Sequence, residues 1–470
     1  MMKLFKKAPL AAGVVIALAS GGAQAISAGT DLNLSGKAKA GAMGGAAYTM
    51  PQEASAAVFG NPATLTQFKG FNMNFGASYL GITSVDVTTS NALGTDSGTA
   101  HSDADDYIIP DFGMTLELAP GLVLGTGLEV DAGLGADYRD DPVGLTGLPG
   151  GALGLNAGAS DVITLPLMVE LISFNANIGL GYQATERLSL GASVTIGFGL
   201  AQLGTTGPTT GISGALGAGG AIPLGLEDFG GTSSSVHDIG FGFSLGSTYA
   251  LTNDVMLSAA YKSPVEYNFS NIVHTSVPGA TSGGDGFQDL RVQQPAEVIV
   301  GIALDNVLAQ GLLIEADVIW KDWSHASTYE DVYDDQFLLV FGGQYQIGAW
   351  SLRAGYSWAE DVLLEKANNT LGGLNGLGTL PLGGPLGTDV VKVAQMSLLP
   401  VIWEHTVTAG VGYQFTDAVS LDGYVAYAFG EEDSRDLNTV GAVLGGATPT
   451  MAVEVEEEIM IGAGITISMP

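Results

Sequence analysis

The chain has 470 residues, of which 48 are acidic and 15 are basic, so its formal net charge is -33 at pH 7. This acidity argues against binding to nucleic acid or another polyanion through bulk electrostatics, and the absence of cysteine excludes disulfides and thiol chemistry. Only 13% of residues are charged, 70 are glycine and the mean hydropathy is +0.31. This mixture is typical of alternating strands with one lipid-facing side.

Residues 1–25 predict a signal peptide. Three lysines precede the apolar run APLAAGVVIALAS, which is too short to span a bilayer, and Ala23, Gln24 and Ala25 form an A-x-A cleavage site. The chain is therefore expected to be exported. No other run approaches the ~20 apolar residues that a membrane helix needs, so a further membrane element would have to be a β-strand.

Alternation of apolar and polar residues predicts fourteen strands. It is clearest where Phe71, Met73 and Phe75 alternate with Asn72 and Asn74. The predicted strands cover residues 71–82, 107–119, 121–135, 170–183, 186–200, 237–251, 253–270, 291–304, 309–323, 334–346, 349–358, 402–416, 418–430 and 456–468.

The connections between these strands alternate strictly between short and long. Short turns such as ATE, LTN and QIG are followed by segments as long as 136–169, 201–236 and 359–401. An up-and-down transmembrane barrel has short periplasmic turns and long external loops. We therefore predict an all-β protein, a fourteen-stranded antiparallel barrel formed by residues 70–470 in the outer membrane of a Gram-negative bacterium.

All tryptophans lie within or close to predicted strand ends, as interfacial aromatic girdles require. The alternative is that these rings pack a soluble core. The five residues are Trp320, Trp323, Trp350, Trp358 and Trp403.

Residues 26–69 precede the first strand and are rich in alanine and glycine but poor in charge. Since the predicted number of strands is even, this segment starts on the periplasmic side of the barrel. Small residues let a backbone approach a wall closely, so we expect the segment to plug the lumen. The alternative is a disordered tail, but disordered segments are usually charged and contain few apolar residues.

Several motifs resemble the FadL family of outer-membrane transporters of long-chain fatty acids and other hydrophobic compounds. The Asn-Pro-Ala element of that family's N-terminal hatch corresponds to Asn61, Pro62 and Ala63, which follow EASA at 53–56. Unlike common outer-membrane barrels, the chain does not end in an aromatic residue. The other similar stretches are AYKSPVEY (260–267), DVIWKDWS (317–324), LRAGYSWAEDVL (352–363) and HTVTAGVGYQF (405–415).

The resemblance implies a monomeric barrel that takes up a fatty acid, an alkane or an aromatic hydrocarbon passively, under the control of the hatch. It also implies ligand capture by external loops and lateral exit at a kink in the third strand. Glycine inside a strand often marks a bend, so Gly127, Gly133 and Gly135 are candidate kink residues. The alternative is that these glycines have no specific role in a glycine-rich chain. Rival functions are a general diffusion porin and a structural or adhesive barrel.

The long loops repeat leucine, glycine and proline where an ion porin would carry charge. Large apolar patches on exposed surfaces usually mark binding sites, so these loops are expected to capture ligand. The alternative is that they cover one another or contact lipopolysaccharide. Candidate capture residues are Ile212, Ile222, Leu224, Leu226 and Phe229.

Strand parity turns Arg353 and Lys321 toward the lumen. A fatty-acid anion in a partly dry lumen needs a paired charge, so these two cations are its candidate partners. The alternative is that lumenal acids such as Glu315 and Asp317 neutralise them.

The sequence predicts no enzyme, no cofactor and no metal site. Residues 242–246 fit G-x-S-x-G, but this motif requires a strand-to-helix turn and here it lies in the middle of a predicted strand. The acidic cluster of Asp103, Asp105 and Asp106 lacks the spacing of a calcium loop.

Overall fold

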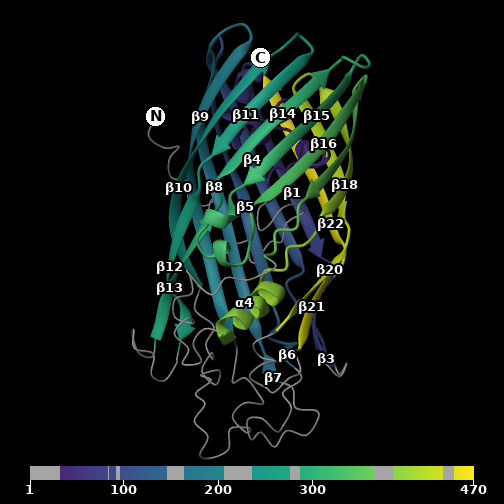
Figure 1. The fold of residues 1–470 in the computed structure, drawn as a ribbon. Helices are drawn as coiled ribbons and strands as arrows, with labels where there is room; N and C mark the ends of the chain where they lie inside the picture. Colours follow the sequence, from purple (N-terminus) through teal and green to yellow (C-terminus); the bar gives the residue numbers. More distant parts are fainter. Residues whose placement is uncertain are drawn as a thin grey trace, which may run out of the picture.

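The computed structural model describes residues 32–82, 84–90, 96–145, 163–205, 235–275, 286–364, 385–437 and 449–469. Fourteen of the described strands form one closed antiparallel barrel (Figure 1). The first and last barrel strands, β1 and β22, pair from Phe71 with Met469 to Ile82 with Glu458, so the sheet has no free edge. The predicted fold class is therefore confirmed.

Each barrel strand overlaps one of the predicted strands. In chain order they are β1 (Phe71–Ile82), β4 (Asp106–Ala119), β5 (Leu122–Asp137), β8 (Leu167–Gln183), β9 (Leu188–Thr205), β10 (Val236–Ala250), β11 (Val255–Lys262), β14 (Glu297–Asp305), β15 (Leu312–Lys321), β16 (Gln336–Ile347), β17 (Trp350–Ala359), β18 (His405–Thr416), β19 (Val419–Ala428) and β22 (Glu458–Met469).

The outer face of the barrel is apolar and the inner face is polar. In β17, Leu352 and Tyr356 are exposed on the outer face, whereas the intervening Arg353 is only 6% exposed. Phe243 of β10 is 46% exposed, and the next residue, Ser244, is buried. Such a surface is stable against lipid, which explains why alternation was the strongest signal in the sequence.

The predicted strand 253–270 is divided in the structure. The barrel strand β11 ends at Lys262, before Ser263 and Pro264. Proline cannot donate a hydrogen bond to a sheet, which disfavours continuation of a central strand. The chain leaves the wall here, and β12 packs on the inner face of β9 and β10, where Val265 meets Gly240. The expectation of one continuous strand was therefore wrong.

Short elements gather at the end of the barrel opposite the C-terminus, which we call the mouth (Figure 1). The barrel strands that flank the long connections have their ends on this side, which is the extracellular side in outer-membrane barrels. The described elements are β2 (Val85–Ser90), β3 (Asp96–His101), β6 (Val143–Leu145), β7 (Ile163–Leu165), β12 (Val265–Thr275), β13 (Gly286–Gln294), η3 (Trp323–His325), η4 (Tyr329–Asp331), α4 (Pro385–Leu398), β20 (Glu431–Asp436) and β21 (Thr450–Val455).

The described helices are short. α4 is the longest of those the structure describes and lies beside β20 and β21. Among the described residues, no helix has the length and apolar character needed to cross a bilayer.

Two of the tryptophans do not join an interfacial girdle. Trp323 is fully buried, and its ring centroid lies 5.0 Å from that of Tyr329. Trp403 is also buried and donates from Nε1 to the Glu456 carbonyl at 2.8 Å. Trp350, by contrast, is 52% exposed on the outer face. The girdle prediction was wrong for Trp323 and Trp403, because both lie just outside barrel strands, where strand parity does not apply.

Candidate functional site

The N-terminal segment, residues 32–69, lies inside the barrel. It contains α2 (Ala38–Gly41), α3 (Ala54–Phe59) and η1 (Pro62–Gln67). α2 contacts β19 and β22, α3 contacts β4 and β5, and η1 contacts β8, β9 and β10. Almost all residues of the segment are buried, so it fills the lumen between opposite sides of the wall.

Glycines of the wall make room for this segment. A Cβ added at Gly191 would overlap the backbone of Pro62, and one added at Gly355 would overlap the backbone of Met43. Close approach of two backbones requires a residue without a side chain. The glycine content of the strands therefore has a packing role wherever the segment touches the wall.

Asn61 links three parts of the structure. Its Oδ1 accepts a hydrogen bond from the Ala63 N–H at 3.0 Å, which caps η1, and Pro62 occupies the favoured first position of that helix. Its Nδ2 donates to the Tyr48 carbonyl at 3.2 Å and to the Ser247 carbonyl of β10 at 3.4 Å. The Asn-Pro-Ala element thus shapes the segment and ties it to the wall.

Two carboxylates of β15 hold the backbone around Thr49. Glu315 accepts hydrogen bonds from the N–H groups of Thr49 at 2.7 Å and Met50 at 3.0 Å. The Thr49 hydroxyl donates to Asp317 at 3.1 Å. Glu315 and Asp317 therefore bind the N-terminal segment, and they do not neutralise the predicted lumenal cations.

Glu53 anchors α2 from within the segment. One carboxylate oxygen accepts from the N–H groups of Lys39 at 2.9 Å and Ala40 at 3.0 Å. Burial and the neighbouring Asp111 carboxylate raise the pKa of Glu53 to about 7, while Lys39 opposes this shift. Burial in turn lowers the pKa of Lys39, against the attraction of Asp422, whose carboxylate lies 3.5 Å from its ammonium group.

The candidate cations Arg353 and Lys321 both point inward and are both paired. Arg353 Nη1 lies 2.8 Å from Asp422 Oδ1. Lys321 is fully buried and lies 3.1 Å from Glu297, which is also 3.1 Å from Lys262. Each cation therefore has a protein carboxylate as its partner.

The structure does not bring these two cations together. Lys321 pairs across the sheet with Gln336 of β16, and Arg353 pairs with Gln344 of the same strand. These positions are eight residues apart on β16, or about 26 Å at the usual rise of a strand. A single carboxylate group cannot contact both cations.

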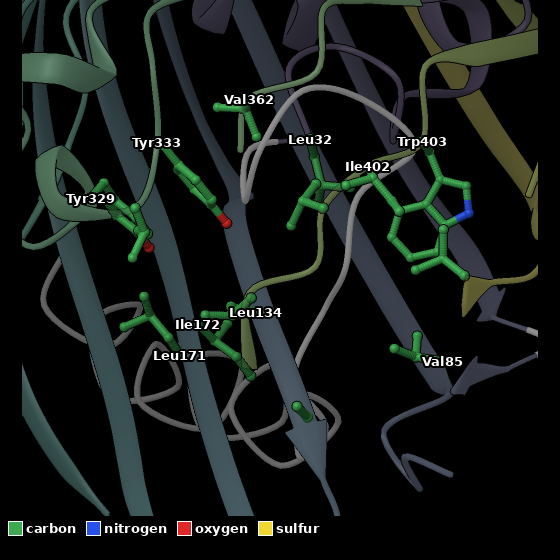
Figure 2. Close-up of a cluster of buried hydrophobic side chains, with 14 of the residues drawn as sticks. Leu32, Val85, Leu134, Leu171, Ile172, Tyr329, Tyr333, Val362, Ile402 and Trp403 are labelled. Atoms are coloured by element: carbon green, nitrogen blue, oxygen red, sulfur yellow. The ribbon is translucent and has the colours of Figure 1, made fainter. Parts of the chain in front are cut away.

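An apolar cluster, which we call the mouth cluster, fills the mouth above the N-terminal segment. Figure 2 shows that its side chains come from segments far apart in the sequence and face one interior. It includes three packed rings, in which Tyr329 and Tyr333 stack at 5.4 Å beside Trp323. The members labelled in Figure 2 are Leu32, Val85, Leu134, Leu171, Ile172, Tyr329, Tyr333, Val362, Ile402 and Trp403.

The wall is incompletely paired between β4 and β5. Their ladder runs from Ala119 with Leu122 to Asp111 with Glu129. Residues 106–110 of β4 and 130–137 of β5 continue as strands without pairing with each other. Above them, the Asp103 N–H donates to the Asp137 carbonyl at 2.9 Å. We call this unpaired stretch the β4–β5 window.

A β-bulge lies in the third barrel strand beside this window. The register between β5 and β8 shifts between Val130 and Ala132, so Asp131 is the extra residue. The candidate kink residues Gly127, Gly133 and Gly135 flank it and pair regularly with β8. The Asp131 carbonyl accepts a hydrogen bond from the Leu32 N–H at 3.0 Å, so the N-terminal segment begins at the window.

The five candidate capture residues lie between 206 and 234, outside the described residues. Residues 242–246 lie within strand β10, without a turn into a helix. Among the residues that the structure describes, no group of three or more histidine, aspartate or glutamate side chains is arranged to hold a metal ion.

Sequence reasoning missed the backbone contacts of Glu315 and the buried carboxylate of Glu458. Parity signalled that Glu315 faces the lumen, but its partners lie about 265 residues away in the chain. Glu458 is fully buried in the first position of β22, next to the mouth cluster. Its sequence context, VEVEEEIM, reads as a solvated acidic run, so only the structure shows its burial.

A closed fourteen-stranded barrel with an apolar belt outside and its own N-terminal segment inside is an outer-membrane channel protein. A family model for outer membrane protein transport protein (OMPP1/FadL/TodX) matches residues 16–371. The chain belongs to this family. Its members form transport channels of the outer membrane, which confirms the predicted family and localisation.

Solved structures of this family share the fold. The Pseudomonas putida toluene transporter TodX is 21% identical, with a TM-score of 0.59, over 93% of this chain and 99% of that one. A Pseudomonas aeruginosa FadL homologue is 14% identical, with a TM-score of 0.64, over 94% and 100%. The Ralstonia pickettii toluene transporter TbuX is 19% identical, with a TM-score of 0.58, over 93% and 100%. No curated protein matches the chain by sequence.

Proposed function

We propose that this barrel admits small hydrophobic compounds passively across the outer membrane. The ligand enters the mouth cluster, the N-terminal segment blocks the straight path to the periplasm, and the ligand leaves sideways through the β4–β5 window. Transfer of apolar surface out of water supplies the driving force, about 0.8 kcal/mol for each methylene that is buried. No cofactor or energy source enters this scheme.

The continuity of the mouth cluster with the β4–β5 window carries this proposal. Tyr107 and Ile109, on the unpaired part of β4, belong to the cluster, and so do Leu134 and Ala136 on the unpaired part of β5. An apolar ligand thus meets apolar side chains from the mouth to the window. The paired wall below the window is instead lined by polar residues such as Asp111 and Glu129.

The N-terminal segment acts in this proposal as a hatch. Residues 1–25 are removed on export, residues 26–69 form the hatch and residues 70–470 form a monomeric barrel. Asn61, Pro62 and Ala63 set the conformation of the hatch, and its hydrogen bonds to Glu315 and Asp317 favour the closed packing. The external residues Ile212, Ile222, Leu224, Leu226 and Phe229 collect ligand, and outer loops contact lipopolysaccharide.

Uncharged hydrocarbons are the ligands that the lumen supports best. Arg353 and Lys321 are both committed to protein carboxylates, so a fatty-acid anion would have to break a buried ion pair. Two of the similar structures are toluene transporters by name. We therefore place aromatic hydrocarbons and alkanes ahead of long-chain fatty acids.

Deletion of Asp131 tests the lateral path. The deletion removes the extra residue of the bulge, so β5 can pair with β8 in one continuous register. We expect uptake of radiolabelled toluene by cells that carry the variant to fall severalfold. Heat-modifiable mobility on gels should show that the variant barrel is still folded. Deletion of Gly348, in a short turn at the far end, is the control. Unchanged toluene uptake in the Asp131 variant would contradict a lateral exit.

The rival functions give different results. A diffusion porin would pass small polar solutes without residues 26–69 as readily as with them. If the protein is a structural or adhesive barrel, deletion of its gene would not change toluene uptake. Equal growth with and without the gene on a fatty acid, an alkane and an aromatic hydrocarbon would exclude the transport function.

A further inference from the structure

Glu458 is a buried carboxylate that nothing in the transport scheme uses. It is fully buried, and neither of its oxygens has a hydrogen-bond partner among the described residues. An ionised carboxylate without a partner costs several kcal/mol in the interior of a protein. A carboxyl group in such a position is therefore neutral, and its hydroxyl donor and its carbonyl acceptor are both available to a ligand.

The surroundings of Glu458 are those of the mouth cluster. Glu458 pairs with Ala428 of β19, and two residues along β22 Met460 faces Leu80 of β1 across the sheet. All three of these neighbours are fully or almost fully buried members of the cluster. Glu458 is therefore a buried carboxyl group at the edge of an apolar surface.

A second buried polar group without a hydrogen-bond partner among the described residues lies close by. Tyr107 pairs with Leu80 on the other side of β1, so its backbone is two strands, or about 10 Å, from Met460. Its side chain faces inward and is buried, and its hydroxyl also has no partner in the described part of the chain. Two polar groups without partners thus border the same apolar surface, beside the β4–β5 window.

We propose that Glu458, assisted by the Tyr107 hydroxyl, forms a polar subsite for hydrophobic ligands that carry one hydrogen-bond donor. Phenols, anilines and alcohols fit this chemistry, because their O–H or N–H group donates to a carboxyl oxygen of Glu458 while their apolar body contacts the mouth cluster. A carboxylate ligand is disfavoured, because its charge would lose its hydration beside the mouth cluster. This inference rests on the proposed function and specifies which hydrophobic compounds the barrel prefers.

Binding of matched ligands to the full mature protein in detergent tests the subsite. Toluene, p-cresol, p-toluidine and p-toluate share one ring and differ in a single group. We expect calorimetry to show p-cresol and p-toluidine binding about fivefold more tightly than toluene, as one neutral hydrogen bond allows, and p-toluate binding most weakly. Equal affinities for p-cresol and toluene would overturn the proposal.

Two substitutions locate the effect. Glu458→Leu should bring the affinities for p-cresol and toluene to within about twofold, since hydrophobic contacts remain and the acceptor is lost. The control Glu454→Leu removes an exposed acid of β21 and should retain the wild-type preference. A preference that persists in Glu458→Leu, or is lost equally in Glu454→Leu, overturns the assignment.

A nearly isosteric variant keeps the test decisive if the leucine variant does not fold. Glu458→Met should bring the affinities for p-cresol and toluene to within about twofold, because a thioether has a similar length but is only a weak acceptor and no donor. An unchanged preference would overturn the proposal. Toluene uptake by vesicles with wild-type protein, compared with empty vesicles, tests the transport function separately, so failure of the subsite and failure of transport are distinguished.

Discussion

Asp422 binds Arg353 on the inner face of the barrel, with 2.8 Å between carboxylate and guanidinium and both side chains almost fully buried. The same carboxylate lies 3.5 Å from Lys39 of the N-terminal segment. One acidic residue of the wall thus joins two cations, one from the wall and one from the segment. In a chain with 15 basic residues, this is a structural use of positive charge.

Replacement of Arg353 should destabilise the barrel. Arg353→Met leaves the buried Asp422 with the Lys39 ammonium at 3.5 Å and a hydrogen bond from the Ser420 hydroxyl at 3.1 Å. Removal of one member of a buried ion pair typically costs about 3–5 kcal/mol. We expect a lower free energy of unfolding in detergent, measured by denaturant titration. The double variant Arg353→Met with Asp422→Asn should recover much of this loss.

The same variant separates a structural role from a ligand role. If Arg353 only serves structure, the ratio of toluene uptake to fatty-acid uptake stays as in the wild type. A selective loss of fatty-acid uptake would show that Arg353 binds the ligand carboxylate.

Loss of Glu315 should loosen the N-terminal segment. Glu315→Leu leaves the N–H groups of Thr49 and Met50 without acceptors, and each such buried donor costs about 1–3 kcal/mol. We expect a higher ion conductance in planar bilayers, because the closed packing is weakened. Glu186→Leu, at an exposed turn, is the control and should conduct as the wild type. Identical conductance of all three proteins would contradict this role.

A side chain at Gly191 should displace the Asn-Pro-Ala element. Gly191→Val places atoms where the backbone of Pro62 lies, whereas the nearest atom to an added Cβ at Gly343 is 3.7 Å away. We expect faster hydrogen exchange at residues 61–67 in Gly191→Val and no change in Gly343→Val, measured by mass spectrometry. Equal exchange in the two variants would show that the wall tolerates this displacement.

The stability of the packed segment should depend on pH through Glu53. Because its pKa is raised to about 7 in the folded protein, the folded chain holds a proton that the unfolded chain releases near pH 4.5. The stabilising contribution is therefore complete below pH 4.5 and is lost as pH rises to about 7. Glu53→Gln should remove this part of the dependence of the unfolding free energy on pH.

Unfolding in detergent between pH 4 and 8 measures this dependence. The difference in unfolding free energy between wild type and Glu53→Gln should change between pH 4.5 and about 7 and level off above pH 7. A difference that is constant with pH would mean that Glu53 titrates normally. Glu186→Gln, which alters an exposed acid, is the control for the change in net charge.

The tertiary structure decided everything that depends on partners distant in the chain. Parity turned Arg353 and Lys321 inward, but only the folded barrel shows that Asp422 and Glu297 bind them. Likewise, the glycines of the third barrel strand signalled an irregularity, and the extra residue is Asp131, whose identity depends on register with β8. A hydrogen-bond partner that lies hundreds of residues away leaves no mark on local periodicity.

The sequence alone determined the barrel, its strand number and the place of the N-terminal segment before it. A strand that faces lipid on one side and the lumen on the other must alternate apolar and polar side chains. This constraint acts on every residue of the barrel strands, as in residues 71–82. Burial of Trp323 and Trp403 in the mouth was decided by tertiary packing, because segments outside the barrel strands are under no such local constraint. Contact with lipid therefore imposes a regular alternation that can be recognised in the sequence. The segments at the mouth have no such pattern, and their structure depends on contacts with residues distant in the chain.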